Sequence, residues 1–275
     1  MTIVTKENYF DHNNHALHQS SIKDYFLCPN YFYRKNVLQT VEQPDKKAFQ
    51  IGKVVDDILT ETDSVDNYAI FEGDRRTKEG KADYQALQDA GKKVISQKDY
   101  DNIINICDAI YKTTAYKEIF KSYNRQEILQ MPMDLGEHFD SLVGKVDFFT
   151  IDENGICHLN DMKTTRSIDD NKFFYACREY GYFFQLFVYS LLLNHKYPEI
   201  KGFSYSILAG ETAEPYRVKY FKIPNSYVEK EADRYLYAIK SIKDGLYDKE
   251  DASLQNPTLL CDPKDREELQ TEGDF

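Results

Sequence analysis

The sequence predicts one α/β domain, in which a mixed central β-sheet is flanked by helices and preceded by a helical N-terminal part. Three observations support this fold class. The 275 residues suffice for one large domain, residues 1–120 carry mainly helical patterns, and strand and helix patterns alternate over residues 121–250. Residues 251–275 are acidic and contain Pro257 and Pro263, which indicates a tail.

The composition is that of an ordinary globular protein, with 41% hydrophobic and 29% charged residues. The N-terminus is polar and shows no secretory signal, and the longest apolar stretch, residues 180–193, is too short to cross a bilayer. We therefore expect a cytoplasmic protein without membrane contact. The net charge of −11 argues against a protein that coats nucleic acid by bulk electrostatics, but it leaves room for an enzyme with a local basic groove.

The N-terminal part contains several helix signals. Ser20 and Ser21 predict a capped helix, which the Cys28-Pro29 step interrupts. A second helix is predicted over residues 51–59, and Ser96 with Asp99 resembles a capping box that starts a helix ending near Lys112. Residues 73–81 read as a mobile segment between them.

From residue 126 onward the pattern changes to strands and longer helices. Glu127, Leu129, Met131 and Met133 share one face of the first strand. The later elements expected are strands over residues 142–151, 156–164, 202–208 and 216–223, an aromatic helix over 170–193 capped by Ser167, and a last helix over 226–246.

The hairpin that joins residues 142–151 to 156–164 brings charged side chains together. If its loop is the three residues 153–155, Gly155 takes the left-handed position of a bulged turn and Asp147 lies opposite Asp161. Lys163, two residues after Asp161, then points to the same face. A loop of two or four residues would place the two aspartates on opposite faces.

Two carboxylates about 5 Å apart repel each other unless a cation lies between them or one binds a proton. Oxygen ligands favour Mg²⁺, with Mn²⁺ as the other candidate, and a nearby ammonium can stabilise the charge that develops in phosphodiester hydrolysis. The alternative is an exposed hairpin with an Asp–Lys surface pair. Spacing alone does not decide between the two.

Several motifs in order resemble the PD-(D/E)XK nuclease superfamily, and within it the RecE/RecB-like branch with the related phage exonucleases. These motifs are G-K-V-D (144–147), L-N-D-M-K-T-T (159–165), Q-L-F-V-Y (185–189), S-I-K-D-Y-F-L-C-P-N-Y-F-Y (21–33), the stretch 52–59 and R-T-K-E-G-K-A (76–82). The resemblance implies a restriction-endonuclease-like core and covers roughly residues 20–190.

The resemblance also implies roles for individual residues. Asp147, Asp161 and the Met162 carbonyl would bind metal, Lys163 would assist the attacking water, and Glu127 matches an acidic position near the metal. Gln185 and Tyr189 match a Q-x-x-x-Y motif on one helix face, which Arg178 and Tyr182 extend as substrate-binding candidates. The alternatives are a solvated Glu127 and an aromatic core helix in which Gln185 is incidental.

Two departures from the family pattern stand out. Gly52 is followed four residues later by Asp56, where the family carries His; Asp56 could ligate a hard cation, or it could form a solvated pair with Asp57. Cys28 resembles the first ligand of an iron–sulfur cluster found in some relatives, but only Cys261 lies in the C-terminal region, so we expect no cluster.

Arg75, Arg76, Lys78 and Lys81 form a basic run. Guanidinium groups suit phosphate, so this run is a candidate contact to the DNA backbone or to a 5′-terminal phosphate. The alternative is a solvated loop.

The sequence therefore favours a Mg²⁺-dependent exodeoxyribonuclease that acts on double-stranded DNA ends. By resemblance it would serve phage-type recombination, work with a single-strand annealing protein and assemble as a homo-oligomer. The alternatives are a catalytically silent DNA-binding or assembly subunit with the same fold, and a structure-specific endonuclease. A glycosidase that uses the carboxylate pair is disfavoured by Lys163 and by the absence of Trp.

Overall fold

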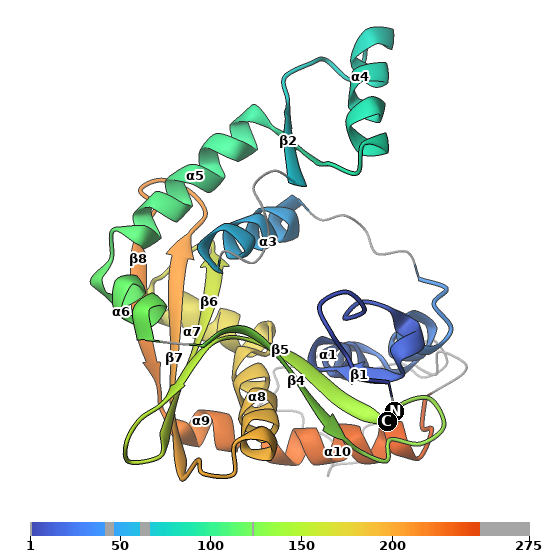
Figure 1. Cartoon of the computed structure of the whole chain (residues 1–275), viewed down its shortest axis with the longest axis vertical. Coiled ribbons are helices and arrows are strands. Elements are labelled where there is room, and N and C mark those ends of the chain that lie inside the picture. The colour runs from blue at the N-terminus through green and yellow to red at the C-terminus, as the bar shows by residue number, and fades with distance from the viewer. Residues whose placement is uncertain (1, 42–46, 61–66, 123, 248–275) are drawn as a thin grey trace, which may run out of the picture.

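The computed structural model describes residues 2–41, 47–60, 67–122 and 124–247. The predicted tail, residues 251–275, lies outside them. A mixed β-sheet forms the centre and helices cover both of its faces, which confirms the predicted fold class (Figure 1). No helix within the described residues is long and apolar enough to span a bilayer.

The central sheet has six strands in the order β1-β5-β6-β7-β8, and β4 pairs with the other edge of β5. The β1–β5 and β6–β7 pairs are parallel, whereas β4–β5, β5–β6 and β7–β8 are antiparallel. The strands are β1 (Ala16–His18), β4 (Asn124–Pro132), β5 (Ser141–Ile151), β6 (Ile156–Thr165), β7 (Gly202–Glu211) and β8 (Val218–Ile223).

In the described residues, two large hydrophobic cores, one on each face, hold the helices to the sheet, and a small third cluster contains Val4, Ala16 and Val143. One core joins three helices to Phe148, Met162 and Leu208 of the sheet. These helices are α3 (Lys47–Thr60), α5 (Gln97–Tyr111) and α6 (Thr114–Ser122). The N-cap predicted for α5 is present, because the Ser96 side chain accepts a hydrogen bond from the Asp99 amide.

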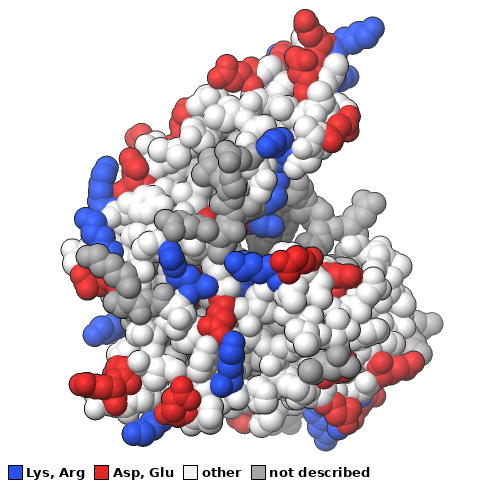
Figure 2. Space-filling model, viewed as in Figure 1, with Lys and Arg blue, Asp and Glu red and all other residues white. Residues whose placement is uncertain are grey.

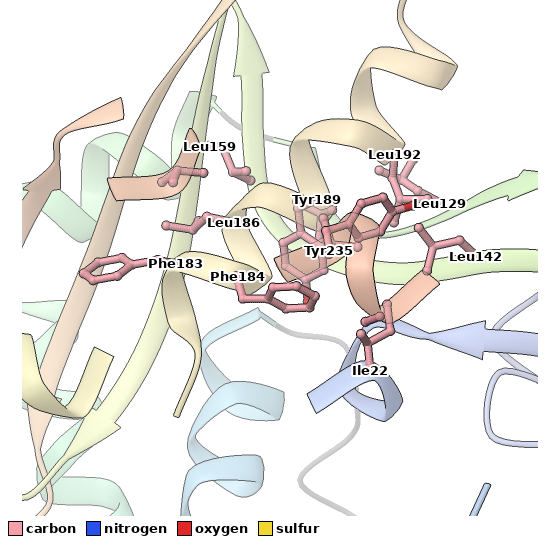
Figure 3. Close-up of a cluster of buried hydrophobic side chains, with 14 of the residues drawn as sticks. Ile22, Leu129, Leu142, Leu159, Phe183, Phe184, Leu186, Tyr189, Leu192 and Tyr235 are labelled. Atoms are coloured by element: carbon pink, nitrogen blue, oxygen red, sulfur yellow. The ribbon is translucent and has the colours of Figure 1, made fainter. Parts of the chain in front are cut away.

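The second core is larger and lies against the opposite face, around α8 (Figure 3). Phe183, Phe184 and Leu186 of α8 pack there with Leu142 and Leu159 of the sheet. The helices on this side are α1 (Gln19–Leu27), α2 (Pro29–Phe32), α7 (Asp170–Glu179), α8 (Tyr182–Lys196), α9 (Asn225–Glu229) and α10 (Ala232–Lys243).

A small unit projects from this body at the top of Figure 1. It consists of β2 (Tyr68–Phe71), α4 (Lys78–Asp89) and β3 (Lys93–Ser96), and its two strands pair in parallel. Of the segment 73–81, expected from its sequence to be mobile, residues 73–77 form a turn and residues 78–81 begin α4. The Thr77 side chain caps that helix by accepting a hydrogen bond from the Gly80 amide.

The N-terminal helix differs from the prediction at its start and agrees at its end. It begins at Gln19, directly after His18, which makes no side-chain cap bond, and Ser21 instead donates to Asn36 Oδ1. The chain is extended at Cys28, and Pro29 opens α2, as the Cys28-Pro29 step predicts. A short 3₁₀ helix (His12–Asn14) precedes these elements, and a π-helical turn (Tyr33–Val37) follows them.

The single helices predicted over residues 170–193 and 226–246 are each two helices. In the first case Gly181 adopts φ +64°, which ends α7 and turns the chain into α8. The cap at its start is Asp169, whose side chain accepts from the Lys172 amide, rather than Ser167. In the second case the chain breaks between Glu229 and Ala232. The spacing of hydrophobic residues does not reveal where a helix breaks when apolar residues lie both before and after the break.

We expect Gly181→Ala to lower the free energy of unfolding by about 1–2 kcal/mol, because an L-residue is disfavoured at left-handed φ. The added Cβ would lie 3.4 Å from Lys23 Cε, an ordinary contact, so the cost comes from the backbone. Urea unfolding measures it. Gly202→Ala, with the same 3.4 Å clearance and no positive φ, is the control. An equally stable Gly181→Ala protein would instead support one continuous helix.

Candidate active site

The hairpin between β5 and β6 has the predicted register. Phe148 pairs with Asn160 and Ile151 with Cys157, in the alignment that places Asp147 opposite Asp161. The Asp152 amide donates to the Ile156 carbonyl at 3.0 Å, which closes the three-residue loop, and Gly155 adopts φ +80°. The turn therefore sets which face Asp161 and Lys163 share.

The two strands separate directly beyond this pairing. The β5–β6 ladder ends at Phe148 and Asn160, while β5 continues to Ser141 and pairs there with β1, and β6 continues to Thr165 beside β7. We call the place where β5 and β6 separate the fork. The Asp147 carboxylate lies in this fork, where its Oδ2 accepts a hydrogen bond from the Met162 amide at 3.1 Å. A side chain thus replaces the backbone partner that Met162 would otherwise find in β5.

Met162 shows why this fork suits a metal site. Its side chain is buried in the core on the α3 side, and its N–H points toward β5. In an extended strand the N–H and C=O of one residue point to the same neighbour. The Met162 carbonyl is therefore expected to face the fork as well, in keeping with its predicted role as a ligand.

Asp161 and Lys163 form a buried ion pair. Lys163 Nζ lies 2.5 Å from Asp161 Oδ2, and the two side chains are 17% and 1% exposed. This Oδ2 accepts no hydrogen bond of regular geometry, so the ion pair is its main polar contact. The Lys163 ammonium also lies 5.0 Å from the centre of the Tyr182 ring.

Helix α8 supplies a second set of side chains from one face of the sheet. Gln185 Nε2 donates to Asp161 Oδ1 at 3.2 Å and to the Tyr189 hydroxyl at 2.9 Å. Tyr182 lies one turn before Gln185, as the i, i+3 spacing requires, and faces Lys163. The helix is part of the core, yet Gln185 is not incidental, because it fixes one oxygen of Asp161.

Helix α3 contributes from the opposite face. A Cβ on Gly52 would lie 3.0 Å from Thr164 Oγ1, so glycine lets α3 approach β6 closely. One turn later, the Asp56 carboxylate reaches the amide of Gln126, at 3.4 and 3.5 Å. Asp57 points elsewhere and accepts the Tyr68 hydroxyl at 2.5 Å. Asp56 and Asp57 are therefore not the solvated pair of the alternative reading.

Two residues of the site were not predicted. Gln126 lies opposite Asp147 in the β4–β5 register, and its Nε2 is 3.4 Å from Asp147 Oδ1. Lys23 of α1 donates to the Tyr180 carbonyl at 3.0 Å and reaches Gln185 Oε1 at 3.5 Å. Lys23 falls within the motif 21–33, but only the folded chain shows which residue of that motif faces α8.

Burial and mutual repulsion perturb the carboxylates strongly. Burial raises the pKa of Asp147 well above its usual range, and Asp56 and Asp161 raise it further. Burial also raises the pKa of Asp56 to about 6, although Lys145 and Lys163 oppose this shift. Three acidic groups thus meet where water is scarce, and a bound cation would relieve their repulsion.

Lys163 remains positively charged in this environment. Burial by itself would lower its pKa, but the nearby Asp161 and Asp147 outweigh burial and raise the pKa above its ordinary value. Lys23 differs, because burial and the neighbouring Lys163 lower its pKa to about 8.

The residues present fit a divalent cation in their chemistry. Asp147 and Asp161 offer carboxylate oxygens at the fork, and buried Asp161 Oδ2 and Gln126 Oε1 lack regular hydrogen-bond partners. Within the described residues, however, no three His, Cys, Asp or Glu side chains form a group that could hold a metal ion. A complete ligand set therefore needs oxygens of another kind, such as amide, carbonyl or water oxygens.

Two predicted residues lie away from this cluster. Glu127 shares the face of Leu129 as predicted, but its carboxylate is bound by Lys196 and by the Tyr197 hydroxyl at the end of α8. Gln185 lies eleven residues earlier, about 16 Å along the helix. Arg178 is exposed on α7. Because the helix breaks at Gly181, Arg178 does not share the helix face that was predicted to carry it together with Gln185.

The basic run lies in the projecting unit and not beside the carboxylates. Arg75 packs over the Tyr84 ring, 4.7 Å from its centre, and Arg76 forms a two-point ion pair with Asp74 while remaining exposed. Lys78 opens α4 at the surface. Figure 2 shows Lys and Arg side chains following one another from the projecting unit into the middle of this face, where acidic groups lie beside them.

We expect the metal-free Asp56→Asn protein to be more stable than the wild type at pH 7.5 and not at pH 4. A folded-state pKa of about 6, above the ordinary 3.8, means that wild-type stability falls as pH rises through this interval. The full shift would correspond to about 3 kcal/mol, and partial exposure of the side chain reduces the expected gain to about 1–2 kcal/mol. Urea unfolding in EDTA measures it. An equal change at both pH values would point to packing rather than charge.

Comparisons with known proteins agree with the predicted fold. Residues 19–253 match a family described as a PDDEXK-like domain of unknown function. The structure is similar to that of a "Putative exonuclease" from Eubacterium rectale over 100% of both chains, with 16% identity and a TM-score of 0.67. The structure of SSO0001 matches 76% of this chain and 96% of its own at 12% identity, with a TM-score of 0.30, which is too low to indicate a shared fold. No curated protein matches the sequence.

Proposed function

Because the chain belongs to the family of PDDEXK-like domains, we propose that it is a metal-dependent deoxyribonuclease whose site is built on Asp147, Asp161 and Lys163. One observation carries the proposal. The β5–β6 fork holds the Asp147 carboxylate against the Met162 amide and places the Asp161–Lys163 pair beside it. The reaction adds water across a P–O bond of the backbone: the water oxygen bonds to phosphorus, and the departing ester oxygen takes a proton.

Asp147, Asp161 and the Met162 carbonyl would hold the cation, with Asp56 as a further candidate from α3. When bound, such a cation polarises a phosphoryl oxygen and lowers the pKa of a bound water. Mg²⁺ suits these oxygen ligands, and Mn²⁺ can replace it. Hydrogen bonds to Met162 and Gln185 fix one oxygen each of Asp147 and Asp161, so both carboxylates are oriented before the ion binds.

Lys163 stabilises charge in this scheme. Because Asp161 and Asp147 raise the pKa of its ammonium, Lys163 can donate hydrogen bonds to the attacking water and to a phosphate oxygen. Tyr182 covers one side of the ammonium, and Gln185 holds Asp161 in place. Gln185 and Tyr182 are partly exposed and would contact the DNA, whereas Tyr189 is buried and would act by holding Gln185.

We further propose that the substrate is the end of double-stranded DNA. The description of the Eubacterium rectale protein names an exonuclease, which supports this choice over an endonuclease. Arg75, Arg76 and Lys78 of the projecting unit would contact the phosphate backbone away from the cleaved bond. The resemblance to phage-type exonucleases supports a homo-oligomer that hands single strands to an annealing protein in recombination.

We expect Lys163→Met and Asp161→Asn each to lower the rate of Mg²⁺-dependent cleavage by a factor of about 10² or more, because each removes charge from the reacting centre. Release of nucleotides from end-labelled linear duplex DNA measures the rate. Lys172→Met, an exposed lysine of α7, is the matched control and should cleave normally. Wild-type rates in both site variants would defeat the assignment.

A comparison of linear with covalently closed circular DNA of the same sequence distinguishes an exonuclease from an endonuclease. An exonuclease degrades the linear form with Mg²⁺ and leaves the closed circle intact, because the circle offers no end. Cutting of the closed circle at a comparable rate would favour the structure-specific endonuclease.

A catalytically silent subunit is the second candidate, favoured by the absence of a three-membered His, Cys, Asp or Glu group from the part of the chain that is described. It predicts no cleavage and no rise in Tm when Mn²⁺ is added. A metal that binds the native state must raise Tm.

A further inference from the structure

We propose that Gln126 is a neutral oxygen ligand of the cation site, which turns its amide to place Oε1 between Asp56 and Asp147 when the ion binds. This inference rests on the proposed metal dependence and adds a ligand that the motifs do not contain. Gln126 precedes Glu127, the residue that the motif comparison suggests, and faces the site in its place.

The amide of Gln126 lies between the two carboxylates. Its Nε2 is 3.4 Å from Asp147 Oδ1 and 3.4 and 3.5 Å from the two Asp56 oxygens. These distances exceed those of strong N–H···O bonds, so Gln126 Nε2 donates only weak hydrogen bonds to the two carboxylates. In the metal-free protein the amide protons thus stand where positive charge is needed.

The oxygen of the same amide has no hydrogen-bond partner among the residues that the structure describes. Gln126 is 2% exposed, and its Oε1 is among the buried polar atoms that make no hydrogen bond. An unpartnered buried acceptor costs on the order of 1–3 kcal/mol, so its presence calls for an explanation. Rotation about the terminal side-chain torsion exchanges Nε2 and Oε1 at little cost, because that torsion is broad and nearly two-fold.

The backbone at Gln126 is also unusual. Its φ of +49° is left-handed, a region that non-glycine residues seldom adopt. The neighbouring pairs, Arg125 with Phe148 and Glu127 with Val146, remain in register, so the distortion is confined to the residue opposite Asp147. Strain of this kind persists where the surrounding structure imposes it, and it is typical of functional sites.

A neutral ligand fits the charges of the site. Asp56, Asp147 and Asp161 already repel one another, and these carboxylates do not by themselves form a metal-binding group in the described chain. An amide oxygen adds a hard ligand of the kind that Mg²⁺ and Mn²⁺ accept without adding a fourth negative charge. Gln126 can therefore complete the ligand set that the carboxylates leave unfinished.

The test is Mn²⁺ binding by calorimetry at pH 7.5, with the Mn²⁺-induced shift in Tm as a second readout. Gln126→Met keeps the length of the side chain and removes the oxygen, so we expect Mn²⁺ affinity to fall about ten-fold or more. Gln126→Glu keeps an oxygen at this position and should bind Mn²⁺ at least as tightly as the wild type. Gln130→Met, the same change on the same strand with its side chain held by Thr2 and Ser141, is the control.

Gln126→Asn guards against loss of folding. Asparagine tolerates left-handed φ better than most residues, so this variant should fold at least as stably, while its shorter side chain withdraws the oxygen and lowers Mn²⁺ affinity. Wild-type affinity in both the Met and Asn variants, or an equal loss in Gln130→Met, would overturn the ligand role and leave the nuclease proposal standing. A wild-type protein that binds no Mn²⁺ would overturn the metal-dependent function itself, and the ligand role with it.

Discussion

The arrangement of the site depends on one hydrogen bond, from the Met162 amide to the Asp147 carboxylate. Two adjacent antiparallel strands normally satisfy each other's backbone, and a strand that loses its neighbour leaves buried N–H groups unpaired. Here β5 leaves β6 after Phe148 to pair with β1, and Asp147 satisfies the amide that this departure exposes. The same bond lets the sheet open and fixes an acidic group in the opening.

The opening allows helices from opposite faces of the sheet to reach one point. Helix α8 approaches from one side with Gln185, and α3 approaches from the other with Asp56. A continuous sheet would lie between these two layers and keep their side chains apart. Each helix is held by its own hydrophobic core, so the polar residues at the centre contribute little to holding the layers together. Their contacts instead orient the carboxylates.

The electrostatics of the site follow from this placement. Lys163 pairs with Asp161, and burial raises the pKa of the other two carboxylates, Asp147 and Asp56. The weak amide contacts from Gln126 do not replace a full charge. The proposed action on DNA is compatible with the net negative charge of the chain, because a cation bound at the site and the local row of basic side chains would determine the electrostatic field at the phosphate.

The hairpin and the side chains that it brings together follow from the local sequence. Gly155, a three-residue loop and the alternation of the strand are local features, so the register that relates Asp147 to Asp161 and Lys163 follows from them. The fold class could also be predicted from the sequence, because the spacing of hydrophobic residues in strands and helices reflects which residues are buried. The Q-x-x-x-Y spacing likewise placed Gln185 and Tyr189 on one face of a helix, where they are bonded to each other.

Which residues from distant segments reach the fork depends on how the helices and strands pack together. Gln126 and Glu127 are neighbours with similar side chains, and the choice between them depended on where β4 twists beside β5 and where α8 ends. Lys23 and Asp56 arrive on helices whose approach depends on packing, as with the contact between Gly52 and Thr164. The helix break at Gly181 likewise separated Arg178 from the helix face that carries Gln185. Hydrophobic periodicity indicates which side of a helix or strand is buried. The partner of each polar side chain depends instead on contacts between elements that are far apart in the chain.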